Sequence, residues 1–321
     1  MRRLSEISIE EIRAARDRLV GTVARTPLVP LNVEHSAEIY LKLENLQPIG
    51  SFKLRGAGNA ILKRPAEELN RGVFTASAGN MAQGVAWCAR RLGVDCHVVV
   101  PDDAPRTKLD AIRRLGGEVI PVPFDRWWDT VVNHEFPGLD GVFIHPVSDP
   151  DVIAGNGTIG LEIIEDLPDV DTVLVPFGGG GLSCGIAAAL GAGRTAAKVY
   201  GCEVATAAPL SAAWAAGEPV PCVEHERGFV DGIGGKSVLV EMWPLIRSLL
   251  AGPLTATIDD IAAAVRDLVT RNRVVAEGAG ASSVAVALSG AAGSGKIVCV
   301  VSGGNIDSAQ LAAILQRDGR E

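Results

Sequence analysis

The stretch Thr172-Val173-Leu174-Val175-Pro176-Phe177-Gly178-Gly179-Gly180-Gly181-Leu182 joins a short apolar run to four consecutive glycines. An apolar run without polar alternation is typical of a strand that is buried on both faces of a parallel sheet. The segment 182–190 that follows is rich in alanine and leucine, and we expect it to form a helix. A strand, a turn and a helix form the repeating unit of an α/β fold, which we therefore expect here.

The same unit recurs on both sides of this stretch. Further strands are expected at residues 39–43, 73–76, 97–100, 118–122, 142–145, 198–204 and 297–301. Further helices are expected at residues 52–63, 80–92, 106–115, 158–166, 258–272, 280–288 and 308–317. Continuous apolar strands that alternate with helices predict two mostly parallel sheets, each covered by helices on both faces, with a cleft between them.

The composition fits a globular protein of about two domains, because the chain has 321 residues and a domain usually has about 100–200. Hydrophobic residues make up 47% of the chain, which excludes a disordered or fibrous protein. The net charge of −8 argues against nucleic acid as a partner. No apolar run is long enough for a membrane span, and the N-terminus lacks a signal-peptide core. Six cysteines without a CxxC pair indicate reduced thiols, so we expect a cytoplasmic protein.

Ligands of such folds bind at the carboxyl ends of the strands, and four expected strand ends carry unusual residues. They are Ser77-Ala78-Gly79-Asn80, the glycines 178–181, Glu203 and Ser302-Gly303-Gly304-Asn305. The glycines are the most informative, since glycine is unfavourable in ordered structure and one or two would suffice for a turn. Free amides at the start of a helix bind anions, so the four glycines indicate a phosphate site.

Three short motifs suggest other functions. The GxGxxG match at 155–160 does not follow a strand directly, and the GxxxxGK match at 290–296 leads into a strand instead of a helix, so neither fits a nucleotide site. The GxSxG match at 181–185 follows a strand, and a serine hydrolase that uses Ser183 therefore stays as a distant alternative. Such an enzyme needs an acid and then a histidine, but no Asp lies between Ser183 and His225, the only later histidine.

A compact phosphorylated cofactor therefore fits the glycines best. If the cofactor is an aldehyde, it requires a lysine that forms a Schiff base with it. Of the seven lysines, Lys53 is distinguished by its place at an expected helix start after Pro48-Ile49-Gly50-Ser51, among apolar neighbours. Burial there would lower the pKa of its amine and make the amine nucleophilic.

Together these segments resemble the tryptophan-synthase-β-like (fold type II) enzymes that use pyridoxal phosphate, and most of all the serine/threonine dehydratase and serine racemase family. The resemblance is carried by residues 44–57, residues 77–86, the glycines 178–181 and Glu277-Gly278-Ala279-Gly280-Ala281. It implies a large cofactor-binding domain of residues 1–70 and 148–321 and a small, mobile, substrate-side domain of residues 71–147. It also implies that the cofactor lies in the cleft between them and that the protein is a homodimer.

The resemblance implies roles for individual residues. Lys53 would hold pyridoxal phosphate as a Schiff base and then act as the base at the substrate Cα. The residues that would bind the cofactor are Phe52, Lys53, Asn80, Gly178, Gly179, Gly180, Gly181, Leu182 and Ser302. The residues that would bind the amino acid substrate are Ser77, Ala78, Gly79, Asn80, Met81 and Gln83. The substrate carboxylate would lie at the start of the helix 80–92, where a helix favours an anion.

The reaction follows from the group that faces the pyridine nitrogen, which the resemblance implies is Ser302. A hydroxyl cannot keep that nitrogen protonated as a carboxylate can, so the ring is a weaker electron sink. Elimination of a group on Cβ is then favoured over reprotonation of Cα. We expect a dehydratase (ammonia-lyase) that converts a β-hydroxy-α-amino acid of the threonine or serine type to a 2-oxo acid and ammonia. A racemase or a β-replacement enzyme of the same fold stays as the alternative.

Several positions depart from the family pattern. Ala78 stands where racemases of the family usually have serine, and alanine cannot move a proton, so racemisation is disfavoured. Met81 replaces the usual histidine, which argues against a second carboxylate on the substrate; the change is either neutral or allows an aryl substrate such as phenylserine. Glu203 lacks the second acid of the usual cation site, so a divalent or monovalent cation is doubtful. Lys236 is either a cation on the substrate side of the site or a surface residue.

Overall fold

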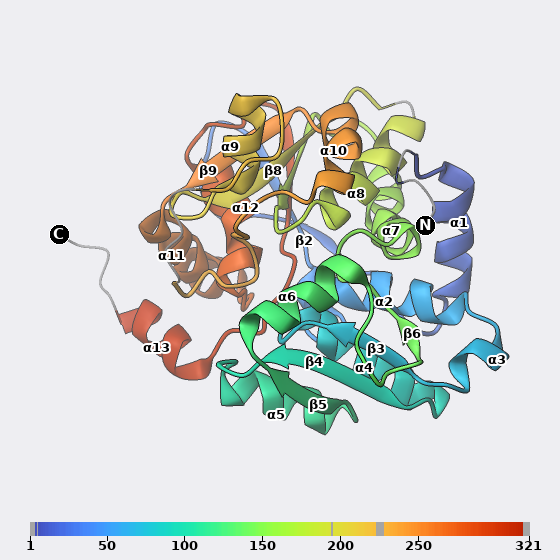
Figure 1. Cartoon of the computed structure of the whole chain (residues 1–321). Helices are drawn as coiled ribbons and strands as arrows, with labels where there is room; N and C mark the ends of the chain where they lie inside the picture. Colours follow the sequence, from blue (N-terminus) through green and yellow to red (C-terminus); the bar gives the residue numbers. More distant parts are fainter. Residues whose placement is uncertain (1–3, 5, 194, 223–227, 317–321) are drawn as a thin grey trace.

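The computed structural model describes Leu4 and residues 6–193, 195–222 and 228–316, and these contain two separate β-sheets (Figure 1). The larger sheet has six strands in the order β1 (Leu28–Pro30), β2 (Glu38–Lys42), β10 (Lys296–Val300), β7 (Thr172–Pro176), β8 (Lys198–Val204) and β9 (Gly252–Ala256). Only β1 pairs antiparallel, with β2, and the other neighbours in this sheet are parallel.

The smaller sheet has four parallel strands in the order β5 (Glu118–Val122), β4 (Cys96–Pro101), β3 (Val73–Ala76) and β6 (Val142–Phe143). The chain thus begins in the larger sheet, forms the whole smaller sheet and then returns to the larger one with β7. The predicted α/β class, with two mostly parallel sheets, is confirmed.

Helices cover both faces of the larger sheet. Successive side chains of each strand point to opposite faces, so each strand contributes to two apolar clusters. Val173 and Val175 of β7 point into one apolar cluster, which includes residues of α1 (Ile9–Arg18), α7 (Pro150–Asp166), α8 (Gly181–Ala192) and α10 (Trp243–Leu249). Leu174 points into the other, which contains α11 (Ile258–Asp267) and α12 (Gly278–Leu288). Burial on both faces explains why these strands are continuous apolar runs.

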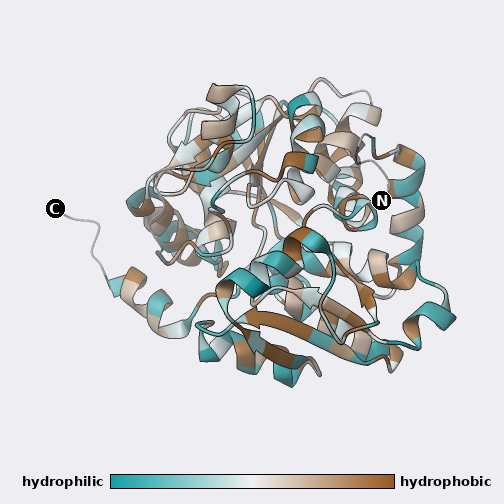
Figure 2. Ribbon diagram, in the orientation of Figure 1, coloured by the Kyte–Doolittle hydropathy of each residue, from teal (hydrophilic) through white to brown (hydrophobic). Residues whose placement is uncertain are grey.

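The smaller sheet is covered in the same way. One face packs against α2 (Lys53–Leu62), α4 (Asn80–Leu92) and α5 (Arg106–Arg114), and the other against α6 (Phe124–Asn133). Figure 2 shows β4 almost wholly in the colour of hydrophobic residues, as expected for a strand between two helical layers. The remaining elements are α3 (Ala66–Leu69), α9 (Pro209–Ala216), α13 (Ser308–Gln316), the turns η1 (Glu44–Leu46) and η2 (Val240–Met242), and the π-helical turn η3 (Leu268–Asn272).

The helix predicted at 158–166 begins eight residues earlier, at Pro150, and this prediction was wrong. The Asp149 carboxylate accepts hydrogen bonds from the amides of Asp151 and Val152, and proline at the first helical position needs no amide partner. The glycines of the GxGxxG match therefore lie inside α7 and not in a turn. Arg317, the last residue of the helix predicted at 308–317, lies outside the described residues.

The glycines of α7 bring three helices into backbone contact. A Cβ at Gly155 would overlap the Arg55 carbonyl of α2, and one at Gly157 would lie 2.9 Å from the Gly185 carbonyl oxygen of α8. A Cβ at Gly185 would in turn overlap the Ile153 carbonyl of α7. The GxGxxG match is thus a helix-packing motif, and it holds the starts of α2 and α8 at a fixed spacing.

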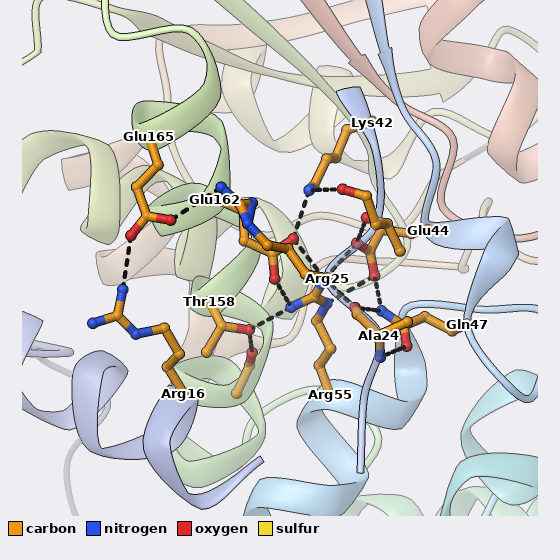
Figure 3. Close-up of polar contacts among 12 residues, drawn as sticks. Arg16, Ala24, Arg25, Lys42, Glu44, Gln47, Arg55, Thr158, Glu162 and Glu165 are labelled. Atoms are coloured by element: carbon orange, nitrogen blue, oxygen red, sulfur yellow. Dashed lines mark hydrogen bonds and ion pairs between the residues drawn. The ribbon is translucent and has the colours of Figure 1, made fainter. Parts of the chain in front are cut away.

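A fully buried ion network joins the larger sheet to α2 and α7 (Figure 3). The Arg55 guanidinium donates to the Glu44 carboxylate at 2.8 Å and to the Glu162 carboxylate at 2.7 Å. Lys42 Nζ donates to the other Glu162 oxygen at 2.5 Å, and Thr158 Oγ1 accepts from Arg55 at 3.0 Å. Burial alone would raise the pKa of Glu44, but the Arg55 guanidinium outweighs burial and holds the pKa below its ordinary value. Two cations and two carboxylates therefore neutralise one another in the interior.

Candidate functional site

A cavity of about 620 Å³ lies where the carboxyl ends of strands from both sheets meet. This volume is in the range of small-molecule sites. Most residues that the sequence singled out line it together. They are Phe52, Lys53, Ser77, Ala78, Gly79, Asn80, Met81, Gly178, Gly179, Gly180, Gly181, Leu182 and Ser302.

Lys53 is the first residue of α2, and the segment before it is tied to the end of β10. The Phe52 amide donates to the Ser302 carbonyl at 3.0 Å, and Ser51 forms an isolated β-bridge with Gly303. Lys53 Nζ donates to the Pro146 carbonyl at 2.8 Å and lies 5.3 Å from the centroid of the Phe52 ring. Burial lowers the pKa of Lys53 to about 8. At neutral pH, a larger fraction of the Lys53 amine is therefore unprotonated than of an exposed lysine amine. The unprotonated amine is the nucleophilic form.

The glycine loop between β7 and α8 is the candidate anion-binding loop, and we call it the anion cradle. Gly180 has a φ of +94°, in the left-handed region, and no side chain caps the start of α8 at Gly181. A Cβ at Gly179 would lie 2.6 Å from a methyl group of Val147, and a Cβ at Gly181 would lie 2.8 Å from the Val147 carbonyl oxygen. Gly179 and Gly181 leave no room for side chains, so the loop presents backbone amides there.

Hydrogen bonds fix the orientation of the Asn80 side chain. Asn305 Nδ2 donates to the Ile49 carbonyl at 2.9 Å and to Asn80 Oδ1 at 2.8 Å. A carbonyl only accepts, so Asn305 must present its nitrogen there and Asn80 must present its oxygen to Asn305. The Asn80 nitrogen then donates to Glu277 Oε1 at 2.8 Å. One further N–H of Asn80 is left, and Asn80 is a hydrogen-bond donor on the cavity wall.

Glu277 is a site residue for which the sequence indicated no role. It lines the cavity, is 9% exposed and stands immediately before α12. Burial, and to a smaller extent the nearby Asp231 carboxylate, raises the pKa of Glu277 to about 7. The only sequence signal of Glu277 was an acid before a small-residue helix, because its hydrogen-bond partner Asn80 is 197 residues away in the chain. Glu277 is therefore a group that can change its charge near neutral pH beside Asn80.

The loop 228–236 meets the helices of the smaller sheet across the cavity. Lys108 Nζ of α5 lies 2.6 Å from Asp231 Oδ2 of this loop. Lys236 Nζ lies 4.7 Å from the centroid of the Phe124 ring of α6. All four residues line the cavity, so Lys236 is an exposed residue at the wall of the site.

Some residues that the sequence singled out do not line the cavity, and Gln83, Glu203 and Ser183 are among them. Glu203 accepts the Leu210 amide at 2.7 Å and both the amide and the hydroxyl of Ser211 at 2.8 Å, so it caps the start of α9. Among the described residues, no three His, Cys, Asp or Glu side chains are grouped so that they could hold a metal ion.

Ser183, the residue of the hydrolase alternative, is fully buried in α8, and its hydroxyl donates to the Gly180 carbonyl at 3.2 Å. The histidine considered with it, His225, lies outside the described residues.

None of the described helices has the length and apolarity that crossing a membrane requires.

Comparison with known proteins identifies relatives over almost the whole chain. The family model described as pyridoxal-phosphate dependent enzyme matches residues 19–303. The L-threonine ammonia-lyase of Geobacter sulfurreducens is 41% identical over 315 residues, which are 95% of this chain and 77% of the relative. The catabolic L-threonine dehydratase TdcB of Escherichia coli is 38% identical over 317 residues, which are 96% of each chain.

Solved structures show the same similarity. The structure of maize serine racemase superposes with a TM-score of 0.87 at 30% identity and covers 96% of each chain. The processed form of threonine deaminase isoform 2 from Solanum lycopersicum superposes with a TM-score of 0.86 at 31% identity, over 98% of this chain and 96% of the relative.

Proposed function

The chain belongs to the pyridoxal-phosphate dependent enzymes, in the threonine dehydratase and serine racemase family, and from this premise we propose its substrate. It is a carbon–oxygen lyase of the ammonia-lyase class. Its proposed substrates are β-hydroxy-α-amino acids of the threonine or serine type, which it converts to a 2-oxo acid and ammonia. The observation that carries the proposal is one cavity that holds a partly buried lysine amine with a lowered pKa, an anion cradle of glycine amides and the start of α4.

The residues of the cavity fit pyridoxal phosphate, the cofactor of the family. The cradle that a Cβ would fill at Gly179 and Gly181 suits a phosphate, and Lys53 at the other side of the cavity suits an aldehyde. Bound pyridoxal phosphate supplies a ring that withdraws electrons from the substrate Cα. Asn80 presents a donor that would stabilise an anionic ring oxygen, and the buried Ser302 hydroxyl would face the ring nitrogen.

The remaining chemistry falls to the side chains of this protein. We propose that Lys53 Nζ takes the proton from the substrate Cα, as a general base with a pKa near neutrality can. The substrate carboxylate would bind at the start of α4, where Gly79 is the cap residue and no side chain occupies the amides. Ala78 offers no second acid–base group on the opposite face, which favours loss of water over racemisation.

Beyond threonine and serine, we propose that a β-aryl amino acid such as phenylserine is a substrate. Its ring would meet the side of the cavity that is formed by Met81, Phe124, Trp127 and Trp128. Apolar and aromatic side chains bind a phenyl substituent more favourably than a polar, hydrated substituent. The methyl group of threonine would contact only part of this apolar wall, whereas a phenyl ring could contact more of it.

A 2-oxo acid assay over a panel of substrates tests both levels of this proposal. We expect ammonia and 2-oxo acid from L-threonine and L-serine, and a kcat/KM for L-threo-phenylserine within about tenfold of that for L-threonine. A much larger preference for threonine would remove the aryl substrate but not the lyase. Inversion of the amino acid without 2-oxo acid would instead support the racemase alternative.

Three further features stay predictions. The division into residues 1–70 with 148–321 and residues 71–147 is supported by the strands, since β3 to β6 all fall in the second segment. Small-angle scattering with and without substrate would detect movement of that segment. The homodimer and the cytoplasmic location stand on the family resemblance and on the sequence composition, and sedimentation would test the dimer.

We predict that Gly181→Ala weakens cofactor binding. The new Cβ would lie 2.8 Å from the Val147 carbonyl oxygen, which is backbone and cannot move away, so the cradle amides must shift. Loss of one hydrogen bond to a charged group weakens binding about 10-fold to 100-fold. Equilibrium titration of the apo-protein with pyridoxal phosphate measures the effect. Gly191→Ala is the matched control, because it lies on the same helix and its Cβ has nothing within 4 Å. Equal affinities of the two variants would contradict the cradle.

We predict a pH profile for cofactor uptake by the apo-protein. Only the neutral amine of Lys53 can react, and its fraction rises with pH until the pKa of about 8 is passed. The uptake rate should therefore rise to about pH 8 and then level off, whereas an ordinary lysine amine keeps gaining up to about pH 10. Visible absorbance after mixing gives the rate, and N-acetyl-lysine methylamide serves as the free-amine control. A protein profile parallel to that of the free amine would show that burial does not lower the pKa of Lys53.

A further inference from the structure

We infer that Asp231 is a specificity-determining residue, whose carboxylate occupies the Lys108 ammonium and so excludes substrates that carry a second carboxylate. The inference rests on the proposed function, because it concerns which β-hydroxy-α-amino acids the same cavity accepts. Asp231 lies in the loop 228–236 and Lys108 in α5, so the pair joins opposite walls of the cavity.

The pair stands where an incoming ligand can reach it. Lys108 Nζ and Asp231 Oδ2 are 2.6 Å apart, and the side chains are 30% and 55% exposed. A solvent-exposed ion pair of this kind contributes little to the stability of the fold, so either partner can be replaced without unfolding the protein. A substrate carboxylate presents the same two oxygens as Asp231 and would compete with it for the one ammonium.

Among the residues that the structure describes, the other cations lining the cavity, Lys53 and Lys236, do not substitute for Lys108. Lys53 is committed to the cofactor in the proposed function, and Lys236 lies against the Phe124 ring. Glu277 and Asp231 are close enough to affect each other, since the Asp231 charge raises the pKa of Glu277 and the Lys108 charge lowers it. A second substrate carboxylate would therefore meet two acids and a cation that is already neutralised. A methyl or phenyl group on Cβ requires no such partner.

The inference predicts a gain of function. In Asp231→Asn the amide no longer neutralises Lys108, and one repelling charge is removed. Lys108 can then bind the side-chain carboxylate of a β-hydroxy acidic amino acid, for which 3-hydroxyaspartate is the probe. Its reaction balances without an oxidant: the Cβ hydroxyl leaves as water, one water is taken up when the nitrogen leaves as ammonia, and the product is oxaloacetate.

The test compares kcat/KM for 3-hydroxyaspartate with kcat/KM for L-threonine in the unchanged holoenzyme and in three variants. We expect Asp231→Asn to raise this ratio about tenfold or more, since like-charge juxtaposition strongly disfavours a wrong partner. The double variant Lys108→Met with Asp231→Asn should lose the gain. Asp110→Asn removes one negative charge from the same helix as Lys108 but lies outside the cavity wall, so it should leave the ratio unchanged.

A binding measurement separates this inference from the proposed function. L-Aspartate lacks the β-hydroxyl that leaves, and its binding is read from the change in visible absorption of the holoenzyme. Asp231→Asn should lower the Kd for L-aspartate about tenfold, and the double variant should reverse the change. An unchanged ratio and Kd in Asp231→Asn, or a gain that survives loss of Lys108, would overturn the inference. Tighter aspartate binding in a protein that turns over no β-hydroxy amino acid would overturn the proposed function instead.

Discussion

Lys53→Ala should abolish turnover and the visible absorption of the holoenzyme. Lys53 is a partly buried lysine at the start of α2, and desolvation of its amine lowers its pKa to about 8. Alanine can neither hold the cofactor covalently nor move the proton at the substrate Cα. Loss of a general base alone costs about 10²-fold to 10⁴-fold in rate, and loss of the covalent link adds to it. Turnover is measured as 2-oxo acid release, and cofactor attachment as absorbance after gel filtration.

Two control variants separate chemistry from folding in this experiment. Lys63→Ala removes the lysine at the other end of α2, which is paired with Asp151 at the protein surface, and should keep both the absorbance and the turnover. Lys53→Arg keeps a cation in the cavity but cannot form the covalent link, and should fail as alanine does. Full activity of Lys53→Ala would end the assignment. If the circular dichroism spectrum shows that Lys53→Ala is unfolded, the result for Lys53→Arg decides the assignment.

Arg55→Met should destabilise the protein more than any substitution at its surface. Arg55 is 1% exposed and bonds to Glu44 and Glu162. Removing one partner of a buried ionic network leaves an uncompensated charge, which costs about 3–5 kcal/mol. Lys42 still neutralises Glu162 in the variant, so Glu44 is the carboxylate left without a cation. Urea unfolding followed by circular dichroism measures the loss.

Arg25 provides the matched control for Arg55. It pairs with Glu165 and Asp166, and its side chain is 50% exposed, so Arg25→Ala should cost less than about 1 kcal/mol. The double variant Arg55→Met with Glu44→Gln should recover part of the lost stability, because the orphaned charge is removed with its partner. Equal losses for Arg25→Ala and Arg55→Met would show that burial of the network does not matter.

Much of the fold could be predicted because local residues end its elements. Asn80–Leu92 was predicted with both ends correct, since Gly79 precedes the helix and Gly93 ends it in a left-handed conformation. The strand Thr172–Pro176 was bounded in the same way by proline and the glycine loop. In α7 the same reasoning failed, because glycine usually signals a turn and here serves close helix packing. Helix α1 was not predicted, although Ser8 and Glu11 form a capping box at its start.

The residues of the site also differ in whether a local sequence pattern identifies them. Lys53 and the glycine cradle could be found because each belongs to a short motif that is complete in the sequence. Glu277 and the Lys108–Asp231 pair could not, since their environment comes from contacts across 197 and 123 residues of chain. A lone acid or lysine has the same local sequence signal whether it lies in solvent or on a cavity wall.

The backbone contacts among α2, α7 and α8 have a mechanical consequence. Where helices meet through side chains, they slide past one another by small rotamer changes, but carbonyl groups against glycines leave no such adjustable layer. Lys53 begins α2 and Gly181 begins α8. The rigid backbone contacts of α7 with both helices therefore fix the distance between these two helix starts. We therefore expect thermal motion to change the spacing between the starts of α2 and α8 less than the spacing between helices that meet through side chains.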